Sequence, residues 1–198
     1  MKIYIKTITC LVLFFSFNAC KEEKKTQKMD NKTLDSIYQK SIEFKDSLNS
    51  YWKLIHKSDS QKLADIKTLL YQISLTKAPD LSKIEQGNMK LKQVSALKYG
   101  QNEIGDNAKV DLFDNTCDSL IAFVSELKSK TPYEENYPLL EDILNDIRTN
   151  NSLDLAVRLR AHYNKWAEKY NESIDELSKF QYPAAAHMKK IDIYGYAE

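Results

Sequence analysis

The chain has 198 residues, in which 29 basic side chains nearly balance 28 acidic ones, for a formal net charge of +1. A near-neutral chain with interspersed charges lacks the electrostatic footprint of a nucleic-acid-binding protein, so we expect no nucleic-acid partner. Only four glycines and four prolines are present, which argues against a turn-rich all-β fold, and the length fits one domain with a sizeable core.

The first twenty residues have the pattern of an export signal. Two lysines precede an apolar run at residues 8–17, and the small residue Ala19 stands directly before Cys20. A membrane-spanning helix needs about 20 apolar residues, whereas a run of 10–14 suits the apolar part of a signal peptide. The ending resembles the lipobox of bacterial lipoproteins, which implies a lipoprotein signal peptide at residues 1–19 and a lipid on the Cys20 thiol.

A lipid on Cys20 would attach the mature chain to a membrane. Two or more acyl chains, palmitate among them, give stable anchoring at about 0.8 kcal/mol per buried methylene. The next residues, Lys21-Glu22-Glu23, resemble the export tag of surface lipoproteins in Bacteroidota, and residues 20–30 as a whole form a lipidated cysteine with a charged tether. We expect a lipoprotein of the cell envelope, on the outer membrane, facing either the surface or the periplasm.

Residues 31–76 carry one apolar stripe at helical spacing. Its members up to residue 55 alternate steps of three and four: Leu34, Ile37, Ser41, Phe44, Leu48, Tyr51 and Ile55. The stripe resumes in the same phase at Leu63, beyond a Ser58–Gln61 segment that has the form of a capping box. The unchanged helical phase of the apolar residues favours one long helix, whereas the capping box at Ser58–Gln61 favours two helices. We favour the single helix.

Similar periodicity predicts the later helices. Asp80 is placed to cap a second helix, which Gly100 would end. A third helix is expected over 110–127, a fourth begins near residue 138, and the last runs over 152–179.

Every convincing segment has the helical period and none alternates like a strand, so the predicted fold class is all-α. Helices joined by short links lie antiparallel, and we expect an antiparallel helical bundle of about four to five helices over residues 31–183. Residues 184–198 form a tail outside this pattern. The apolar groups of residues 191–198 either fold back onto the bundle or present a short docking strand.

A Tyr-Asn pair is repeated in the last predicted helix. Tyr163-Asn164 recurs as Tyr170-Asn171 seven residues later, and because seven residues are nearly two turns, the like side chains share a face. The tyrosine rings are expected to fill the bundle seam with their hydroxyls at its wetter edge. The asparagines are expected to hydrogen-bond a facing helix and fix its register.

These elements resemble the LemA family of bacterial envelope proteins, in which a Tyr-Pro segment precedes an Arg-rich helix with two Tyr-Asn pairs. The residues that carry the resemblance or share its packing register are Tyr137, Pro138, Arg160, Tyr163, Asn164, Trp166, Tyr170 and Asn171. The resemblance covers roughly residues 135–185 and implies an antiparallel bundle at a membrane, with no defined reaction. LemA proteins usually hold the membrane through an N-terminal hydrophobic helix, which a lipid would replace here.

The sequence lacks the residue sets that common reactions need. No two of the three histidines are spaced to share a helical face, and no Glu-x-x-His pair is present for a di-iron site. Nucleophile-elbow, phosphate-loop and dinucleotide motifs are also missing. Cys117 falls on an apolar face, as a buried packing residue does. We expect no catalytic residue, no metal site and no cofactor.

The sequence thus favours a non-catalytic envelope lipoprotein that is anchored through Cys20. Its LemA-like bundle would serve as a protein-interaction or structural module for an unidentified envelope protein. The alternative is a ligand-carrying lipoprotein that holds a small molecule between its helices. A cavity beside Trp52 or Trp166 would distinguish the second function from the first.

Overall fold

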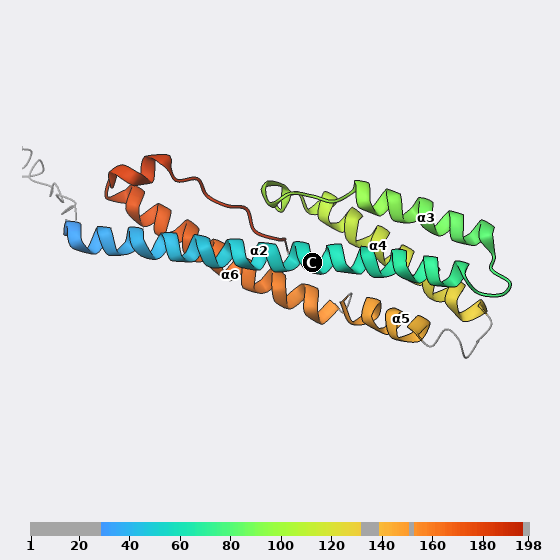
Figure 1. Cartoon of the computed structure of the whole chain (residues 1–198). Coiled ribbons are helices and arrows are strands. Elements are labelled where there is room, and N and C mark those ends of the chain that lie inside the picture. Colours follow the sequence, from blue (N-terminus) through green and yellow to red (C-terminus); the bar gives the residue numbers. More distant parts are fainter. Residues whose placement is uncertain (1–28, 132–138, 151–152, 196–198) are drawn as a thin grey trace, which may run out of the picture. The chain divides into compact units, whose positions relative to one another are not determined.

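The computed structural model describes residues 29–131, 139–150 and 153–195 (Figure 1). The predicted signal peptide, Cys20 and most of its tether lie outside these ranges, as do Tyr137 and Pro138. The chain divides into two units after Asp30, and the helices described below belong to the second unit. None of the helices in the described ranges has both the length and the apolar character needed to span a bilayer.

The described residues form five α-helices and no strand, which confirms the predicted all-α helical bundle. In chain order the elements are α2 (Asn31–Ser74), α3 (Leu81–Ala96), the 3-10 turn η1 (Gln101–Glu103), α4 (Asn107–Lys130), α5 (Leu139–Asn150), α6 (Leu153–Lys179) and the 3-10 turn η2 (Pro183–His187).

The first helix, α2, is continuous over 44 residues. This confirms the single helix predicted from apolar residues that keep one helical phase. The Ser58–Gln61 segment does not start a new helix. The Gln61 side chain points along the helix and donates to the Asp65 carboxylate at 2.8 Å. Burial of one unbroken apolar face therefore outweighs the local capping preference.

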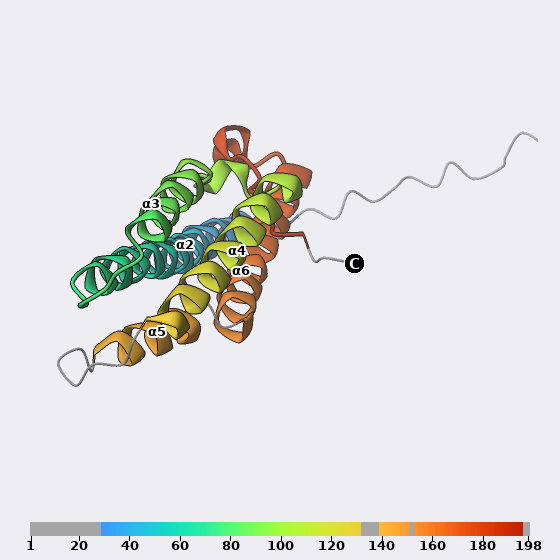
Figure 2. The ribbon, with the colours of Figure 1, turned by 90° about the vertical axis from the view of Figure 1, so that its right-hand side faces the viewer.

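Two sets of helices lie along α2. The C-terminal half of α2 lies beside α3, α4 and α5 (Figure 1 and Figure 2). Because α2 contacts α3, α3 contacts α4, α4 contacts α5 and α5 contacts α2, these four helices form a ring of neighbours. The other half of α2 lies against α6, which runs antiparallel to it: Tyr182 contacts Tyr38, and His162 contacts Tyr51. Helices α5 and α6 follow one another in the same direction along α2 (Figure 1).

One continuous apolar core includes residues from all five described helices. Its fully buried members include Leu48 and Ile66 of α2, Phe113 of α4 and Ile147 of α5. Cys117 is 1% exposed in this core, which confirms it as a packing residue. Burial raises the pKa of its thiol to about 11, so the thiolate is disfavoured at neutral pH.

The predicted end of α3 is wrong by several residues. Helix α3 ends at Ala96, and Gly100 does not cap it; its φ of −90° is ordinary, and its N–H donates to the Glu103 carboxylate at 2.7 Å. Tyr99 and Ile104 are both buried, so side chains anchored in the core hold this connection in place. The predicted cap at the start of α3 is confirmed, because the Lys83 N–H donates to Asp80 at 3.0 Å.

Candidate functional site

Residues 188–195, the tail segment, fold back onto the bundle. The segment has no regular secondary structure from residue 188 to residue 195. It runs along α6 from η2 toward the start of α4, and Figure 1 shows it in red beside the ribbon of α2. Of the two arrangements that the sequence left open, folding back is the one that the structure shows.

Two asparagines of α6 hold the main chain of the tail segment. Asn171 donates to the Ile191 carbonyl at 2.8 Å and accepts from the Ile191 N–H at 2.9 Å. Asn164 does the same with Tyr194, at 2.9 and 2.8 Å. An amide side chain offers one donor and one acceptor side by side, which complements the two main-chain groups of one extended residue. We call Asn164 and Asn171 the asparagine ladder.

The spacing of the asparagine ladder matches the spacing of an extended chain. Seven residues of helix rise about 10.5 Å, and three residues of extended chain span about 10 Å. Two asparagines that are seven residues apart in α6 therefore lie opposite two tail residues that are three positions apart. The expectation that Asn164 and Asn171 bond a facing helix is wrong, because the tail segment occupies the position beside them.

The side chain of Tyr194 enters a pocket at the end of the asparagine ladder. Tyr194 is 3% exposed, and its ring meets the Tyr163 ring edge-on at 5.4 Å and the Tyr99 ring at 6.4 Å. The Arg160 guanidinium lies 5.0 Å from the centre of the Tyr194 ring, within cation–π range. We call Tyr99, Arg160 and Tyr163 the anchor pocket. Burial raises the pKa of both Tyr194 and Tyr99.

A paired carboxylate fixes the Arg160 guanidinium in the anchor pocket. The two terminal nitrogens of Arg160 donate to the Asp114 carboxylate of α4 at 2.6 and 2.8 Å, and one of them also donates to the Tyr99 hydroxyl at 3.3 Å. Burial is the largest single effect and would lower the pKa of Arg160, but the hydrogen bonds to Asp114 and the charge interactions with Asp114, Tyr99 and Tyr194 together raise this pKa. Arg160 is therefore a permanent cation that joins α6 to α4 beside the Tyr194 ring.

The tail segment approaches the bundle closely at two glycines. The Gly195 N–H donates to the Asn107 side-chain carbonyl at 3.2 Å, and a Cβ atom at position 195 would overlap that side chain. A Cβ at Gly105 would lie 3.0 Å from the Asp192 carboxyl carbon. The pairing of tail segment and bundle is thus close on both sides.

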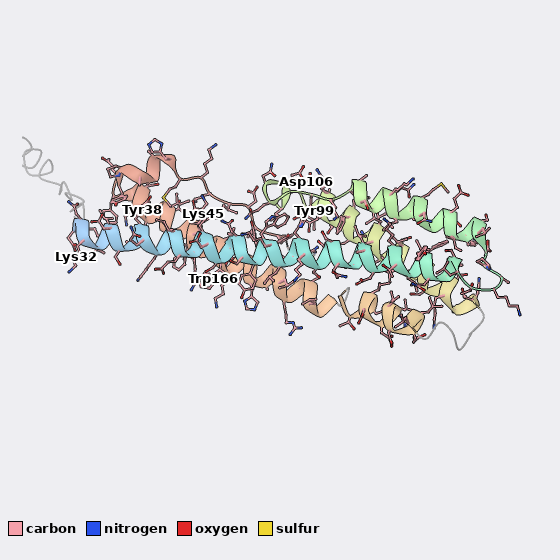
Figure 3. All side chains as sticks on the ribbon, in the orientation of Figure 1. Lys32, Tyr38, Lys45, Tyr99, Asp106 and Trp166 are labelled. Carbon is pink, nitrogen blue, oxygen red and sulfur yellow. The ribbon has the colours of Figure 1, made fainter. Side chains whose placement is uncertain are left out.

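The other aromatic residues singled out in the sequence lie elsewhere along α6. Tyr170 is buried, as predicted for a seam residue, with the Lys45 ammonium 5.9 Å from its ring centre. Trp166 is half-buried beside Phe44, at 5.7 Å between ring centres. Figure 3 places the labelled Tyr99 near the start of α4 and Trp166 on the α6 side of α2.

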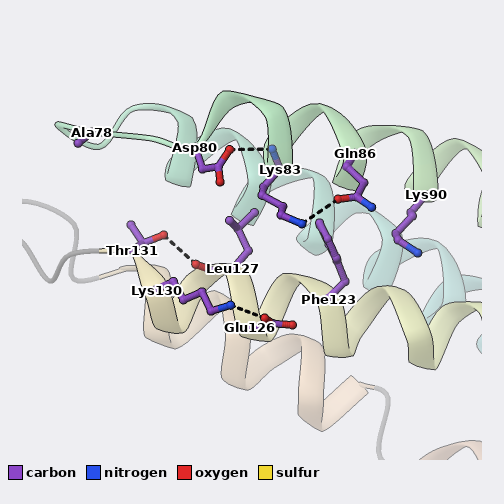
Figure 4. Close-up of a pocket in the computed structure, with 10 residues that line it drawn as sticks. All are labelled: Ala78, Asp80, Lys83, Gln86, Lys90, Phe123, Glu126, Leu127, Lys130 and Thr131. Carbon is purple, nitrogen blue, oxygen red and sulfur yellow. Dashed lines mark hydrogen bonds and ion pairs between the residues drawn. The ribbon is translucent and has the colours of Figure 1, made fainter.

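A second hollow, the lysine groove, lies between α3 and α4 (Figure 4). It has a volume of about 470 Å³ and is lined by Ala78, Asp80, Lys83, Gln86, Lys90, Phe123, Glu126, Leu127, Lys130 and Thr131. The ammonium groups of Lys83 and Lys90 lie 6.0 and 5.7 Å from the Phe123 ring centre. Lys130 is paired with Glu126.

The space beside Trp52 is too small for a ligand. The hollow lined by Trp52, Tyr99 and Phe113 measures about 10 Å³, hardly enough for a single water molecule. The rings of Trp52 and Tyr99 lie 6.2 Å apart and fill this region. A small-molecule cavity at Trp52, which the sequence proposed as a distinguishing feature, is therefore absent from this part of the structure.

Sequence reasoning missed several members of the tail site. Asp114, Tyr99 and Asn107 come from α4 and from the connection before it, and each is far in sequence from its partner. No local pattern marks such pairs. The apolar residues of the tail were the usable signal for Tyr194. Within the described ranges, no three histidine, cysteine, aspartate or glutamate side chains gather as a metal site would require.

Comparisons of this chain with protein families, with curated proteins and with solved structures find no match. The described residues form an all-α bundle with a docked tail segment.

Proposed function

We propose that this protein is a lipid-anchored lipoprotein of the bacterial cell envelope whose helical bundle is a non-catalytic protein-interaction module. The Lys-flanked apolar run before Cys20 supports the anchor, and the Tyr-Asn repeats support kinship with LemA proteins. Both lines of support come from the sequence. The site adds a third, which concerns what the bundle binds.

The observation that carries the proposal is the pairing of the asparagine ladder with an extended main chain. Four hydrogen bonds of 2.8–2.9 Å go to main-chain groups, and none of the four needs a particular tail side chain. Main-chain pairing with an extended segment is a recurring way in which proteins bind peptides. The surface of α6 is thus suited to bind polypeptide, whereas the site holds no free nucleophile with a base beside it.

A photocrosslinking experiment on intact cells tests the proposal. A photoreactive residue replaces the exposed Glu172, next to Asn171 in α6, and a matched control replaces the exposed Lys67 of α2. We expect one discrete protein adduct from position 172, none from position 67, and loss of the adduct in Cys20→Ala. Recovery of only uncrosslinked monomer from position 172 would contradict the proposal.

The lysine groove supports the alternative, a ligand-carrying lipoprotein. Its volume of about 470 Å³ lies within the usual range of small-molecule sites, and two ammonium groups flank the Phe123 ring. An aromatic anion fits this combination of charge and ring. Anilinonaphthalene sulfonate should bind saturably, with at least tenfold loss in Lys83→Gln/Lys90→Gln and no loss in the exposed control Lys92→Gln. Unsaturable binding, or equal binding in all three proteins, would exclude this function.

A further inference from the structure

We propose that the asparagine ladder and the anchor pocket form a binding site for an extended segment of a partner protein that carries an aromatic residue. The tail segment is then the resident ligand of the site, which the partner displaces. This inference rests on the proposed interaction function and names the chemistry of the partner.

The contacts of the tail segment define what the site recognises. Ile191 and Tyr194 are held through their main-chain groups, while the intervening Asp192 and Ile193 are exposed. Only Tyr194 places a whole side chain in the anchor pocket. The site therefore selects an extended backbone at two positions, three residues apart, and an aromatic ring at the second of them.

The anchor pocket favours an aromatic ring over an aliphatic side chain. The Arg160 cation is held over the ring by Asp114, and two tyrosine rings meet the Tyr194 ring edge-on. A cation and ring edges both attract the negative face of an aromatic ring.

The tail segment is attached in a way that permits exchange. Residues 188–190 connect it to η2 without regular secondary structure. The ion pair of Lys190 with Asp175 is more than half exposed on both sides, and exposed pairs contribute little. Release of the tail segment thus separates it from α6 without breaking a hydrogen bond within any helix. A partner segment with the same intrinsic affinity as the tail segment must match the effective concentration of the attached tail, which is in the millimolar range for short flexible links.

Peptide binding to full-length chains that hold their own tail weakly tests the inference. Tyr194→Ala empties the anchor pocket, and Ile191→Pro removes the N–H that donates to Asn171. The probe is a fluorescent peptide of residues 188–198, and its anisotropy is measured against each chain. We expect saturable binding to both variants and at least tenfold weaker binding to the wild-type chain, whose own tail competes.

Two altered peptides identify the contacts that matter. Methylation of the amide nitrogens of Ile191 and Tyr194 deletes two main-chain donors and leaves every side chain in place, so binding should fall at least tenfold. The exposed-residue control, Ile193→Ala, should bind as the parent peptide does. If either variant is unstable, the wild-type chain replaces it in the binding measurement, with the peptide at millimolar concentration. The unmethylated peptide should again bind more tightly than the methylated one.

Three results would overturn the inference. One is the lack of saturable binding to variants that keep wild-type helical content and cooperative unfolding. Another is equal binding of the methylated peptide. A third is a wild-type dimer that the peptide dissociates, because a second copy would then supply the occupant. If the peptide fails to bind while the photoadduct at position 172 still forms, this inference fails and the proposed function stands.

Discussion

Asn164 and Asn171 use the same amide chemistry in two different surroundings. Asn164 is 1% exposed, whereas Asn171 is half-buried and open to water. Replacing a buried partner leaves main-chain groups without hydrogen bonds, whereas water satisfies the same groups at an open site. Replacing Asn164 should therefore lower the free energy of unfolding more than replacing Asn171.

Asn164→Ala should lower the free energy of unfolding by about 1–3 kcal/mol, because the N–H and C=O of Tyr194 lose their partners inside the protein. Asn171→Ala, the matched control, should cost about half as much or less. Urea unfolding followed by circular dichroism measures both. An equal decrease in the free energy of unfolding in the two variants would show that burial of the asparagine does not determine the size of the effect.

Tyr194 should make the stability of the bundle fall at alkaline pH. Burial raises the pKa of Tyr194 in the folded protein above its ordinary value of about 10. The contribution of the neutral Tyr194 side chain to the free energy of unfolding is therefore fully present below about pH 10. It is lost as the pH rises beyond that value. Melting temperatures from pH 8 to pH 11 should fall less steeply in Tyr194→Phe than in the wild type.

The control for this series is Tyr71→Phe, at a side chain that is 60% exposed. It should follow the wild-type curve. If Tyr194→Phe follows that curve as well, ionisation of Tyr194 does not limit alkaline stability.

At the scale of elements, the continuity of α2 is the clearest success of sequence reasoning. Apolar residues kept one helical phase through Ser58–Gln61, and a continuous buried face is a property that periodicity reports directly. The same argument located α4 and α6 to within a few residues. It failed at the end of α3, because the burial of Tyr99 and Ile104, rather than a glycine stop, shapes that connection.

Ser60→Pro tests whether α2 is one helix in solution. Within a continuous helix this proline removes a hydrogen bond and clashes with the carbonyl of residue 56, at a cost of about 3 kcal/mol or more. In the first turn of a separate helix capped by Ser58, proline would be tolerated. Ser60→Ala, which loses only an exposed bond from Lys98, provides the control. Matching thermal stability of the two variants would indicate a break at Ser58.

The tail site was beyond the reach of periodicity for a physical reason. Hydrophobic patterns report which face of a regular element is buried, and the tail segment has no regular element. The repeat of Tyr-Asn was visible, and its two tyrosines lie in the seam as predicted. The partners of the asparagines were not visible, because a side-chain amide pairs equally well with a helix or with an extended chain. The pair of Arg160 with Asp114 joins residues 46 positions apart, among many charges of both signs.

At the scale of the whole molecule, the proposed function joins a lipid anchor at Cys20 to a bundle that binds main chain. In this proposal the anchor would set where the protein works, and the asparagine ladder would set what it contacts. An anchored module meets its partners at the raised local concentration of a membrane surface, so modest affinity at the ladder suffices.

The most direct test of the lipid anchor is the intact mass of the native protein extracted from membranes. We predict a mature chain that begins at Cys20 and carries fatty acyl chains on that residue, together with loss of both features and of membrane association in Cys20→Ala. A native chain that begins at Met1, carries no fatty modification and fractionates with the cytosol would contradict this prediction.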